Sequence, residues 1–356
     1  MRIGFDAKRY FYNRTGLGNY SRVVVDSLAQ NQPDCNFYLF APGKPDWQAK
    51  WPNLHLHTLP NRFPWQRVWG VAKHAQQEQI DVFHGLSNEI PAGLKRRNIK
   101  SVVTIHDVIF RRYPEYYKAI DRFIYDRKTA FAVKHADVVI ATSHATANDL
   151  QEFYGLDAGR VQVIYQPIDA SWYNFETGDV QMERPYFLYI SSFTQRKNHG
   201  TLIQAFSTIH KQTDCDLVLA GATGETLELC KRFVKNEGLT GRVHFEADCE
   251  PGRLRLLTQQ AKAFVYPSLF EGFGIPLAEA AAKGLPLAVS DTAIFRELAG
   301  EAGLYFNPNN AEEMASVMLD VLRPEYAAQM QQGRELLLVK IRAEEMVEKL
   351  MGVYGG

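Results

Sequence analysis

The sequence predicts an α/β protein of two Rossmann-like domains, each built on a doubly wound parallel sheet, that face a common cleft. Three observations support this fold class. Short apolar runs alternate with longer amphipathic stretches from one end of the chain to the other. The periodicity lapses once, near the middle, and 356 residues exceed what one typical core holds. The expected parts are an N-terminal domain over 1–170, a C-terminal domain over 171–335, and a helix over 336–356 that packs back toward the first domain.

The first half contains seven candidate strands, short runs rich in β-branched and aromatic residues. They are Ile3 to Asp6, Phe37 to Ala41, Leu54 to Leu59, Val82 to His84, Ser101 to Ile105, Val138 to Thr142 and Val161 to Ile164. Amphipathic stretches between them predict helices. These run from Tyr20 to Ala29, Val68 to Gln79, Tyr117 to His135, and Ala145 to Tyr154. Ser143 is the expected N-cap of the last of these helices.

Proline, glycine and polar residues from Gln166 to Pro185 predict the interdomain linker. A second series of strands then follows. They are Tyr186 to Ser191, Asp216 to Ala220, Val243 to Glu246, Ala263 to Tyr266, Pro286 to Ser290 and Leu304 to Phe306. The expected helices are Leu202 to Lys211, Thr226 to Asn236, Gly252 to Ala261, Pro276 to Lys283 and Ala311 to Leu322, followed by one amphipathic segment from Met330 to Met351. In such folds ligands bind beyond the carboxyl ends of the strands, so the chemistry is expected in strand-to-helix loops.

Composition excludes several classes of protein. The chain carries 40 Lys and Arg against 40 Asp and Glu, so no overall charge draws it to nucleic acid. Residues 1–175 carry 22 basic and 16 acidic residues, a net charge of +6, which leaves −6 for the remainder. A basic first half suits an anionic lipid surface or an acidic partner, although solvation alone also explains it.

The four cysteines lie far apart and form no Cys-x-x-Cys pair, which is typical of reduced thiols in a cytoplasm. No apolar stretch approaches the ~20 residues that cross a bilayer, so any membrane contact is expected to be peripheral, at the inner membrane face. The expected location is cytoplasmic.

The most informative motif is the segment from Pro267 to Glu279, which follows a buried strand and opens a helix. Gly272 and Gly274 allow the backbone to approach a ligand closely, and amides at the start of the helix form an anion site. Glu271 and Glu279 are spaced so that both carboxylates reach one cleft, where they can hold sugar hydroxyls. The expected ligand contacts in this segment are Gly272, Phe273, Gly274, Ile275, Pro276, Leu277 and Glu279.

Further candidates follow other strands. Arg196 and Lys197 lie in a strand-to-helix loop, where cations can neutralise a pyrophosphate as a bond to it breaks. Gly16 and Gly18 follow the first strand and predict a tight turn, although the G-x-G-x-x-G fingerprint is incomplete. His106 follows the strand that ends at Ile105, at the predicted cleft edge; a lone histidine is more often structural.

The setting Phe-Glu-Gly-Phe-Gly-Ile-Pro-Leu-Ala-Glu-Ala around Glu271 and Glu279 resembles the retaining nucleotide-sugar glycosyltransferases of family GT4, which have the GT-B fold. The resemblance extends over Lys283 to Pro286, Val289 to Asp291, Arg296-Glu297 and Gly303 to Phe306. It implies an acceptor domain over 1–170 and a nucleotide-sugar donor domain over 171–335.

The resemblance also implies a role for each candidate residue. Glu279 would bind the nucleotide ribose, Glu271 would lie at the donor sugar, and Lys197 matches the phosphate-binding lysine. Many members have an arginine directly after a glycine at the strand end; here Ser192 and Phe193 stand there, and Arg196 would take over that role. The remaining contacts by resemblance are Gly16 and Gly18 at the phosphate or acceptor, His106 at the sugar, and Gly221 near the base.

The resemblance therefore implies a hexosyltransferase, and no cofactor or metal is expected. The expected donor is GDP-mannose, with a UDP-glucose-type sugar as the alternative, and the expected acceptor is a glycan or lipid-linked glycan of a bacterial surface polysaccharide or lipopolysaccharide. Two rivals stay open: a GT-B sugar-nucleotide epimerase and a nucleotide-binding protein without catalysis. A metal-dependent enzyme using the Asp-x-Asp motif Asp214-Cys215-Asp216 is not favoured. The last motif precedes its strand, which is the wrong sheet edge for a ligand loop.

Overall fold

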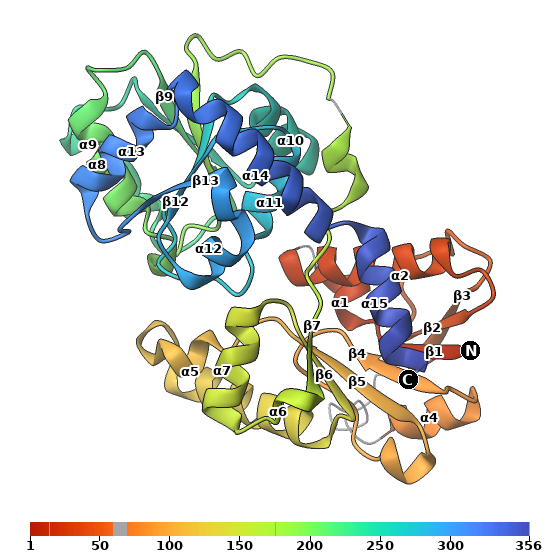
Figure 1. Ribbon diagram of the computed structural model, residues 1–356. Helices are drawn as coiled ribbons and strands as arrows, with labels where there is room; N and C mark the ends of the chain where they lie inside the picture. Colours follow the sequence, from red (N-terminus) through yellow and green to blue (C-terminus); the bar gives the residue numbers. More distant parts are fainter. Residues whose placement is uncertain (14, 60–69, 175, 356) are drawn as a thin grey trace. The chain divides into compact units, whose positions relative to one another are not determined.

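The computed structural model describes residues 1–13, 15–59, 70–174 and 176–355. These residues divide into two units, each with its own sheet (Figure 1). The first unit consists of Met1–Asp169 together with Ile341–Gly356, and the second of Ala170–Lys340. The start of the helix expected from Val68 and one linker residue, Phe175, lie outside the described residues.

The first unit contains a seven-stranded sheet in the order β3-β2-β1-β4-β5-β6-β7, and every pairing is parallel. The strands are β1 (Arg2–Asp6), β2 (Asn36–Pro42), β3 (Leu54–Leu59), β4 (Val82–Gly85), β5 (Lys100–Ile105), β6 (Val138–Ala141) and β7 (Val161–Val163). Most of their residues are buried, as expected for strands covered by helices on both faces. The predicted strands match these within one residue at each end.

The helices of the first unit are α1 (Lys8–Tyr12), α2 (Gly16–Asn31), α4 (Val71–Gln77), α5 (Ile109–Arg112), α6 (Ala119–His135), α7 (His144–Tyr154) and α15 (Ala343–Gly355). Ser143 caps α7 as predicted, because its side chain accepts a hydrogen bond from the Thr146 amide. Helix α15 packs beside α2, although more than 300 residues separate them in sequence (Figure 1). Its residues Met346, Leu350 and Tyr354 belong to the same hydrophobic core as Val24 and Leu28 of α2.

The second unit contains a six-stranded parallel sheet in the order β10-β9-β8-β11-β12-β13. The strands are β8 (Tyr186–Ile190), β9 (Asp216–Gly221), β10 (Val243–Ala247), β11 (Ala263–Tyr266), β12 (Leu287–Ser290) and β13 (Gly303–Phe306). The helices are α8 (His199–Ile209), α9 (Leu227–Asn236), α10 (Pro251–Gln260), α11 (Ile275–Ala282), α12 (Ala293–Ala299), α13 (Ala311–Asp320) and α14 (Ala327–Lys340).

The structure corrects the expectation of one closing amphipathic segment from Met330 to Met351. That stretch is broken at Ile341 and Arg342 into α14, which packs in the second unit, and α15, which packs in the first. Ile341 is almost fully buried at the break, so packing of its side chain overrides the helical periodicity of the sequence. Helices α1 and α12, five and seven residues long, were not predicted, since such short pieces carry little periodicity.

Strand order reverses once in each sheet, between β1 and β4 in the first unit and between β8 and β11 in the second. The carboxyl edge at such a reversal is the usual ligand site of an open α/β sheet. None of the helices within the described residues has the length and apolar character required to span a bilayer.

Candidate active site

The second unit gathers its charged candidates at the strand reversal. Arg196 and Lys197 follow β8 in a single 3-10 turn, and Glu271 follows β11, the neighbouring strand. A backbone hydrogen bond joins the two loops, in which the Leu269 amide donates to the Arg196 carbonyl at 3.0 Å. Residues 74 apart in sequence thus lie at one sheet edge, as their positions after β8 and β11 predicted.

The Glu271 carboxylate is held by both cations. Oε1 accepts a short hydrogen bond from Lys197 Nζ, and Oε2 lies 3.1 Å from an Arg196 guanidinium nitrogen. The Lys197 and Glu271 side chains are each only 9% exposed. Burial alone would raise the pKa of Glu271, but the positive charges of Lys197 and Arg196 lower it to about 2. Glu271 is therefore a carboxylate at every physiological pH.

Two tyrosines and an asparagine that the sequence did not single out support this cluster. Tyr266, at the end of β11, donates its hydroxyl to Glu271 Oε1 at 3.1 Å. Tyr189, in β8, donates to the Lys197 carbonyl at 2.8 Å and is fully buried. Asn198 joins three loops, because its amide donates to the carbonyls of Pro267 and Pro308 at 3.1 and 2.7 Å. Their neighbours in space come from distant strands, so the local sequence carried no signal for them.

The glycine-rich segment begins α11 with a left-handed residue. Gly274 is the N-cap at φ +112°, and a Cβ there would lie 3.0 Å from the Phe295 ring. The positive φ and the lack of space for a side chain both favour glycine at this position. The expectation that Leu277 offers its amide to an anion is wrong, because that amide donates to the Gly274 carbonyl at 3.0 Å. Pro276 has no N–H, so the amides available to an anion in this turn are those of Gly274 and Ile275.

The remaining residues of this segment that were predicted to contact a ligand are Glu279, Phe273 and Gly272. Glu279 lies inside α11 and is half-buried. Phe273 is buried, so only its backbone can meet a ligand. Gly272 precedes it and is partly exposed.

Gly221 ends β9 at φ +131°, and a Cβ there would lie 2.1 Å from the Ser191 carbonyl oxygen. The glycine therefore brings the end of β9 against the end of β8. Just beyond it, the Asp248 carboxylate accepts hydrogen bonds from the Thr223 amide, at 2.8 Å, and from the Thr223 hydroxyl. Gly221 thus makes its close approach to the backbone at the end of β8, at the same carboxyl edge of the sheet.

In the first unit, Gly16 and Gly18 do not form the loop that was expected. Helix α2 begins at Gly16, so both glycines lie in its first turn. A Cβ at Gly18 would lie 1.8 Å from the Asn13 carbonyl oxygen, and the Gly18 amide donates to Thr15 and to the Asn13 side chain. Because Gly18 has no side chain, the chain before α2 can pack closely against it. Gly16 has open space around it and remains accessible to a ligand.

His106 lies directly after β5 and is 6% exposed. Its Nδ1 accepts from the Gln166 side-chain amide at 2.7 Å, and its Nε2–H donates to the Leu86 carbonyl at 2.8 Å. These two bonds define a neutral Nε2–H tautomer, and burial lowers the pKa of His106 to about 4. The predicted sugar contact through a ring nitrogen is therefore blocked while both bonds are intact.

A second buried histidine ties α15 to the sheet. Tyr354 of α15 hydrogen-bonds His84 Nδ1 at 2.7 Å, and His84 Nε2 contacts the Thr104 hydroxyl at 2.8 Å. Thr104 also contacts the Tyr20 hydroxyl at 3.1 Å, and the Tyr20 ring packs edge-on against His106 at 4.6 Å. Burial lowers the pKa of His84 to about 3, so it stays neutral.

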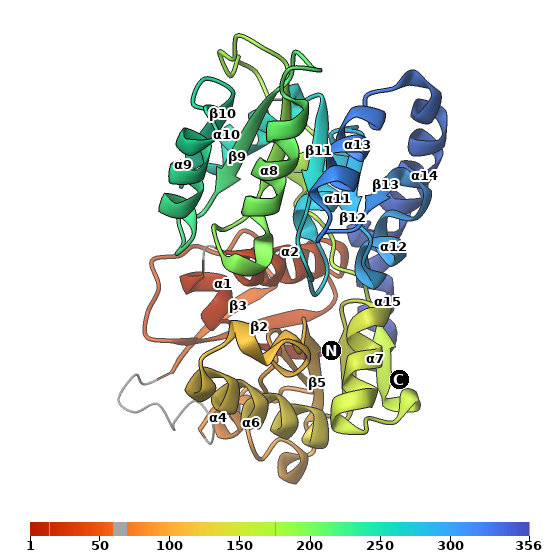
Figure 2. The same ribbon diagram turned by 90° about the vertical axis from the view of Figure 1, so that its left-hand side faces the viewer.

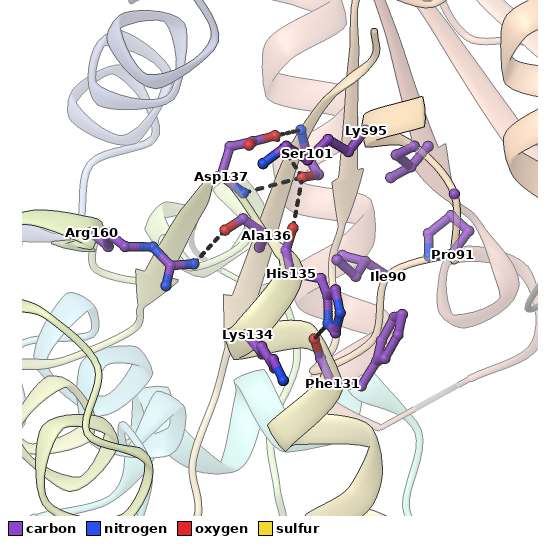
Figure 3. A pocket seen from close by; sticks show the side chains of 12 residues that line it. Ile90, Pro91, Lys95, Ser101, Phe131, Lys134, His135, Ala136, Asp137 and Arg160 are labelled. Atoms are coloured by element: carbon purple, nitrogen blue, oxygen red, sulfur yellow. Dashed lines mark hydrogen bonds between the residues drawn. The ribbon is translucent and has the colours of Figure 1, made fainter. Parts of the chain in front are cut away.

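Cavities bordered by described residues of the first unit include two of interest. One, of about 190 Å³, is bordered by His106 and by residues of α6, among them Tyr125 and Lys128. The other, of about 400 Å³, lies at the amino ends of β5 and β6, away from the predicted site (Figure 3). Lys95, Lys134 and Arg160 line it, together with the Phe131 and His135 rings, which stack at 4.3 Å.

The Asp-x-Asp motif lies in an ion-pair network. Asp216 begins β9, and its carboxylate accepts from Arg242 Nε at 2.7 Å and lies 2.9 Å from His244 Nε2. Across the described residues, no group of three or more His, Cys, Asp and Glu side chains is placed to hold a metal ion.

Comparison with known proteins gives two consecutive family matches. A model described as Glycosyltransferase Family 4 matches residues 15–172, and one described as Glycosyl transferases group 1 matches residues 172–335. The O-antigen chain mannosyltransferase B of Escherichia coli is 24% identical over 372 aligned positions, which cover 96% of this chain and 95% of that protein. The O-antigen chain mannosyltransferase RfbU of Salmonella typhimurium is 28% identical over 225 positions, 62% of this chain and 60% of that protein.

Solved structures show the same fold at lower identity. A sucrose-phosphate synthase from Thermosynechococcus elongatus matches with a TM-score of 0.80 and 20% identity, over 99% of this chain and 98% of that one. HepE from Anabaena, solved in complex with UDP, matches with a TM-score of 0.76 and 15% identity over the whole of both chains. The two-sheet architecture expected for GT-B proteins is thereby confirmed.

Proposed function

The chain belongs to glycosyltransferase family 4, and from that premise we propose that it transfers mannose from GDP-mannose to a hydroxyl of a growing bacterial surface polysaccharide. The observation that carries this proposal is the match to a mannosyltransferase over nearly the full length of both chains. The charged cluster of Arg196, Lys197 and Glu271 at the strand reversal supplies the chemistry. A UDP-linked donor is the alternative, because HepE was solved with UDP and with UDP-glucose.

The second unit binds the donor in this proposal. The diphosphate is neutralised by Lys197 and Arg196 and accepts hydrogen bonds from the Gly274 and Ile275 amides. Glu279 binds the ribose hydroxyls. Gly221 allows the nucleobase to approach the end of β9. The Lys197 charge is now shared with Glu271, so an arriving diphosphate competes with that carboxylate for the same ammonium.

The reaction retains the anomeric configuration. Glu271 is fixed by two cations and the Tyr266 hydroxyl, an arrangement suited to holding charge in place rather than to attacking carbon. We therefore favour a front-face route. The C1–O bond to the diphosphate breaks, the acceptor oxygen bonds C1 on the same face, and the acceptor proton goes to a leaving phosphate oxygen. The cations stabilise the charge that develops on that phosphate, and no cofactor or metal is required.

The acceptor in this proposal is a lipid-linked glycan, met at the inner face of the cytoplasmic membrane. The net charge of +6 over residues 1–175 supports a peripheral contact with an anionic surface. The cavity bordered by His106 and α6 is of a size for one or two sugar rings and is the candidate acceptor pocket.

A ligand panel tests the donor. A nucleotide that binds only the folded protein raises its melting temperature by mass action, so we expect GDP and GDP-mannose to raise it and UDP, ADP and their sugars to leave it unchanged. Stabilisation by UDP and not by GDP would indicate a UDP-sugar donor instead of GDP-mannose. If none of these nucleotides stabilises the protein, the proposed function is refuted.

Variants test the residue roles. We expect Glu271→Ala to abolish transfer while sparing nucleotide affinity, because the cations that face the phosphates remain. Glu279→Ala should weaken nucleotide binding, and Glu228→Ala, on the exposed face of α9, is the matched control. Wild-type activity in both test variants would contradict the site. Interconversion of the donor sugar without acceptor would favour an epimerase instead.

A further inference from the structure

Helix α6 exposes an unusual concentration of large apolar side chains. Ile120, Phe123, Ile124 and Tyr125 are 63, 61, 42 and 46% exposed, and all four lie within six residues. Apolar groups gathered in this way on a folded surface mark a contact with another molecule or a membrane.

Three of these four exposed side chains, Ile120, Phe123 and Ile124, lie on one face of α6. Positions 120, 123, 124, 127, 131 and 134 are spaced so that they share one face of α6. The opposite face carries Thr129, Ala132 and Val133, which are buried, and α6 packs against β5 (Figure 2). The outer stripe therefore reads Ile120, Phe123, Ile124, Arg127, Phe131 and Lys134, apolar at its start and basic toward its end. Phe131 is partly buried against the core of this unit, and the other five side chains are exposed.

The cations of this stripe, Arg127 and Lys134, differ from their neighbours in having no acidic partner among the described residues. Arg111, Arg112 and Lys128 nearby pair with carboxylates. Within the part of the chain that the structure describes, no ion pair is found for Arg127 or Lys134. Arg127 lies over the Phe123 ring, 5.8 Å from its centroid, so charge and apolar surface are adjacent.

The basic end of the stripe continues into the 400 Å³ hollow (Figure 3). Lys134 shares this hollow with Lys95 and Arg160. The Arg160 guanidinium donates to the Val133 and Ala136 carbonyls. Asp137, the acid of the lining, accepts from the Ser101 amide and hydroxyl. The hollow therefore carries an excess of positive charge.

We propose that this outer stripe of α6 is the surface through which the protein docks on an anionic phospholipid bilayer. Exposed apolar side chains beside cations suit a bilayer surface, because apolar groups can enter the boundary of the acyl chains while cations are attracted to anionic headgroups. Charge favours this occupant over a second copy of the chain, since a two-fold contact between stripes would bring like charges together. Ile120, Phe123 and Ile124 insert among the lipids, while Arg127 and Lys134 meet the phosphates.

The location of the stripe ties it to the proposed function, on which this part of the inference rests. Tyr117 and Tyr125, at the apolar end of the helix, border the same cavity as His106. Docking through Ile120 and Phe123 would place that cavity next to the bilayer, where a lipid-linked acceptor is held.

Vesicle co-sedimentation of the full chain tests the surface. We expect binding to phosphatidylcholine vesicles containing phosphatidylglycerol, and much weaker binding to phosphatidylcholine alone. In Arg127→Gln/Lys134→Gln the affinity should fall about 30-fold, at about 1 kcal/mol for each cation near the surface. In Ile120→Asn/Phe123→Asn it should fall at least about tenfold.

Matched controls lie in the second unit. Leu229→Asn/Leu336→Asn removes two leucines that are 55 and 59% exposed, and Arg232→Gln/Lys235→Gln removes two exposed cations of α9. Both controls should bind vesicles like the wild type. All four variants should keep the melting temperature and its increase with GDP, which separates a failure of docking from a failure of the proposed function.

Equal vesicle binding by the α6 variants and the wild type, or no binding by the wild type, would overturn the proposal. A dimer that forms with rising concentration and is lost in the Ile120→Asn/Phe123→Asn variant would also overturn it, in favour of a second copy.

Discussion

The pair formed by Lys197 and Glu271 allows a quantitative prediction. Replacing Lys197 with Met leaves a carboxylate that is 9% exposed with Arg196 as its remaining cation. Removing one partner of a buried ion pair costs about 3–5 kcal/mol, because a charge stays buried without compensation. Since Arg196 still compensates in part, we expect the lower end of that range for Lys197→Met, and a smaller cost for Glu271→Gln, which keeps an acceptor for the Tyr266 hydroxyl.

The double variant is the decisive measurement. In Lys197→Met/Glu271→Gln neither charge of the pair is left, so part of the lost stability should be regained and the coupling energy of the cycle should reach about 2 kcal/mol. Hydrogen exchange at the amides of β8 and β11 reports the opening free energy of this part of the second unit, without assuming that the two units unfold together.

A control pair and a refuting result complete this test. Arg253 and Glu246 lie in the same unit and are 31 and 27% exposed, so their coupling should stay below about 1 kcal/mol. If the effects of Lys197→Met and Glu271→Gln simply add, with a coupling energy no larger than that of the control pair, the two groups do not form the buried pair described above.

Three further outcomes are expected. Gly221→Ala should destabilise the second unit by at least about 2 kcal/mol in urea unfolding, since φ is +131° and the new Cβ would lie 2.1 Å from a carbonyl oxygen. Gly200→Ala, with open space around it, should be neutral or stabilising, and equal effects would contradict this account. Tyr354→Phe should cost about 1–3 kcal/mol of unfolding free energy by leaving His84 Nδ1 buried without a donor; a change below about 0.5 kcal/mol, the size usual for a surface substitution, would show that the bond contributes little. Burial lowers the pKa values of His84 and His106 to about 3 and 4, below the unfolded value, so stability is complete above about pH 6.5 and falls by about 1.4 kcal/mol per pH unit for each histidine as the pH drops toward those values. Thermal melts at pH 7.5 and 5.0 check this, and a higher melting temperature at pH 5.0 would refute it.

Local patterns predicted the strands well. The limits of β3 and β11 were predicted without error, because turn residues or charges bound each of these short segments. Placing candidate residues after strands also predicted correctly that Lys197 and Glu271 would reach one sheet edge. The break at Ile341 was missed, since both sides of it are helical in pattern and only the choice of packing partner divides them.

The hydrogen bonds that restrain the candidate side chains could not be predicted. Gln166 and His106 are 60 residues apart, and His84 and Tyr354 are 270 apart. Each bond depends on which strands are neighbours and on which face a side chain lies. The family resemblance therefore implied a sugar contact at His106, whereas Gln166 and Leu86 occupy both of its ring nitrogens in the structure.

The first unit is discontinuous in sequence, since the whole second unit is inserted between Asp169 and Ile341. During translation, residues 1–169 leave the ribosome long before Met346, Leu350 and Tyr354, which complete their core. The part of α2 that α15 contacts then stays uncovered while some 170 further residues are synthesised. The second unit, continuous in sequence, can fold in that interval, so the unit made first is the one that finishes last.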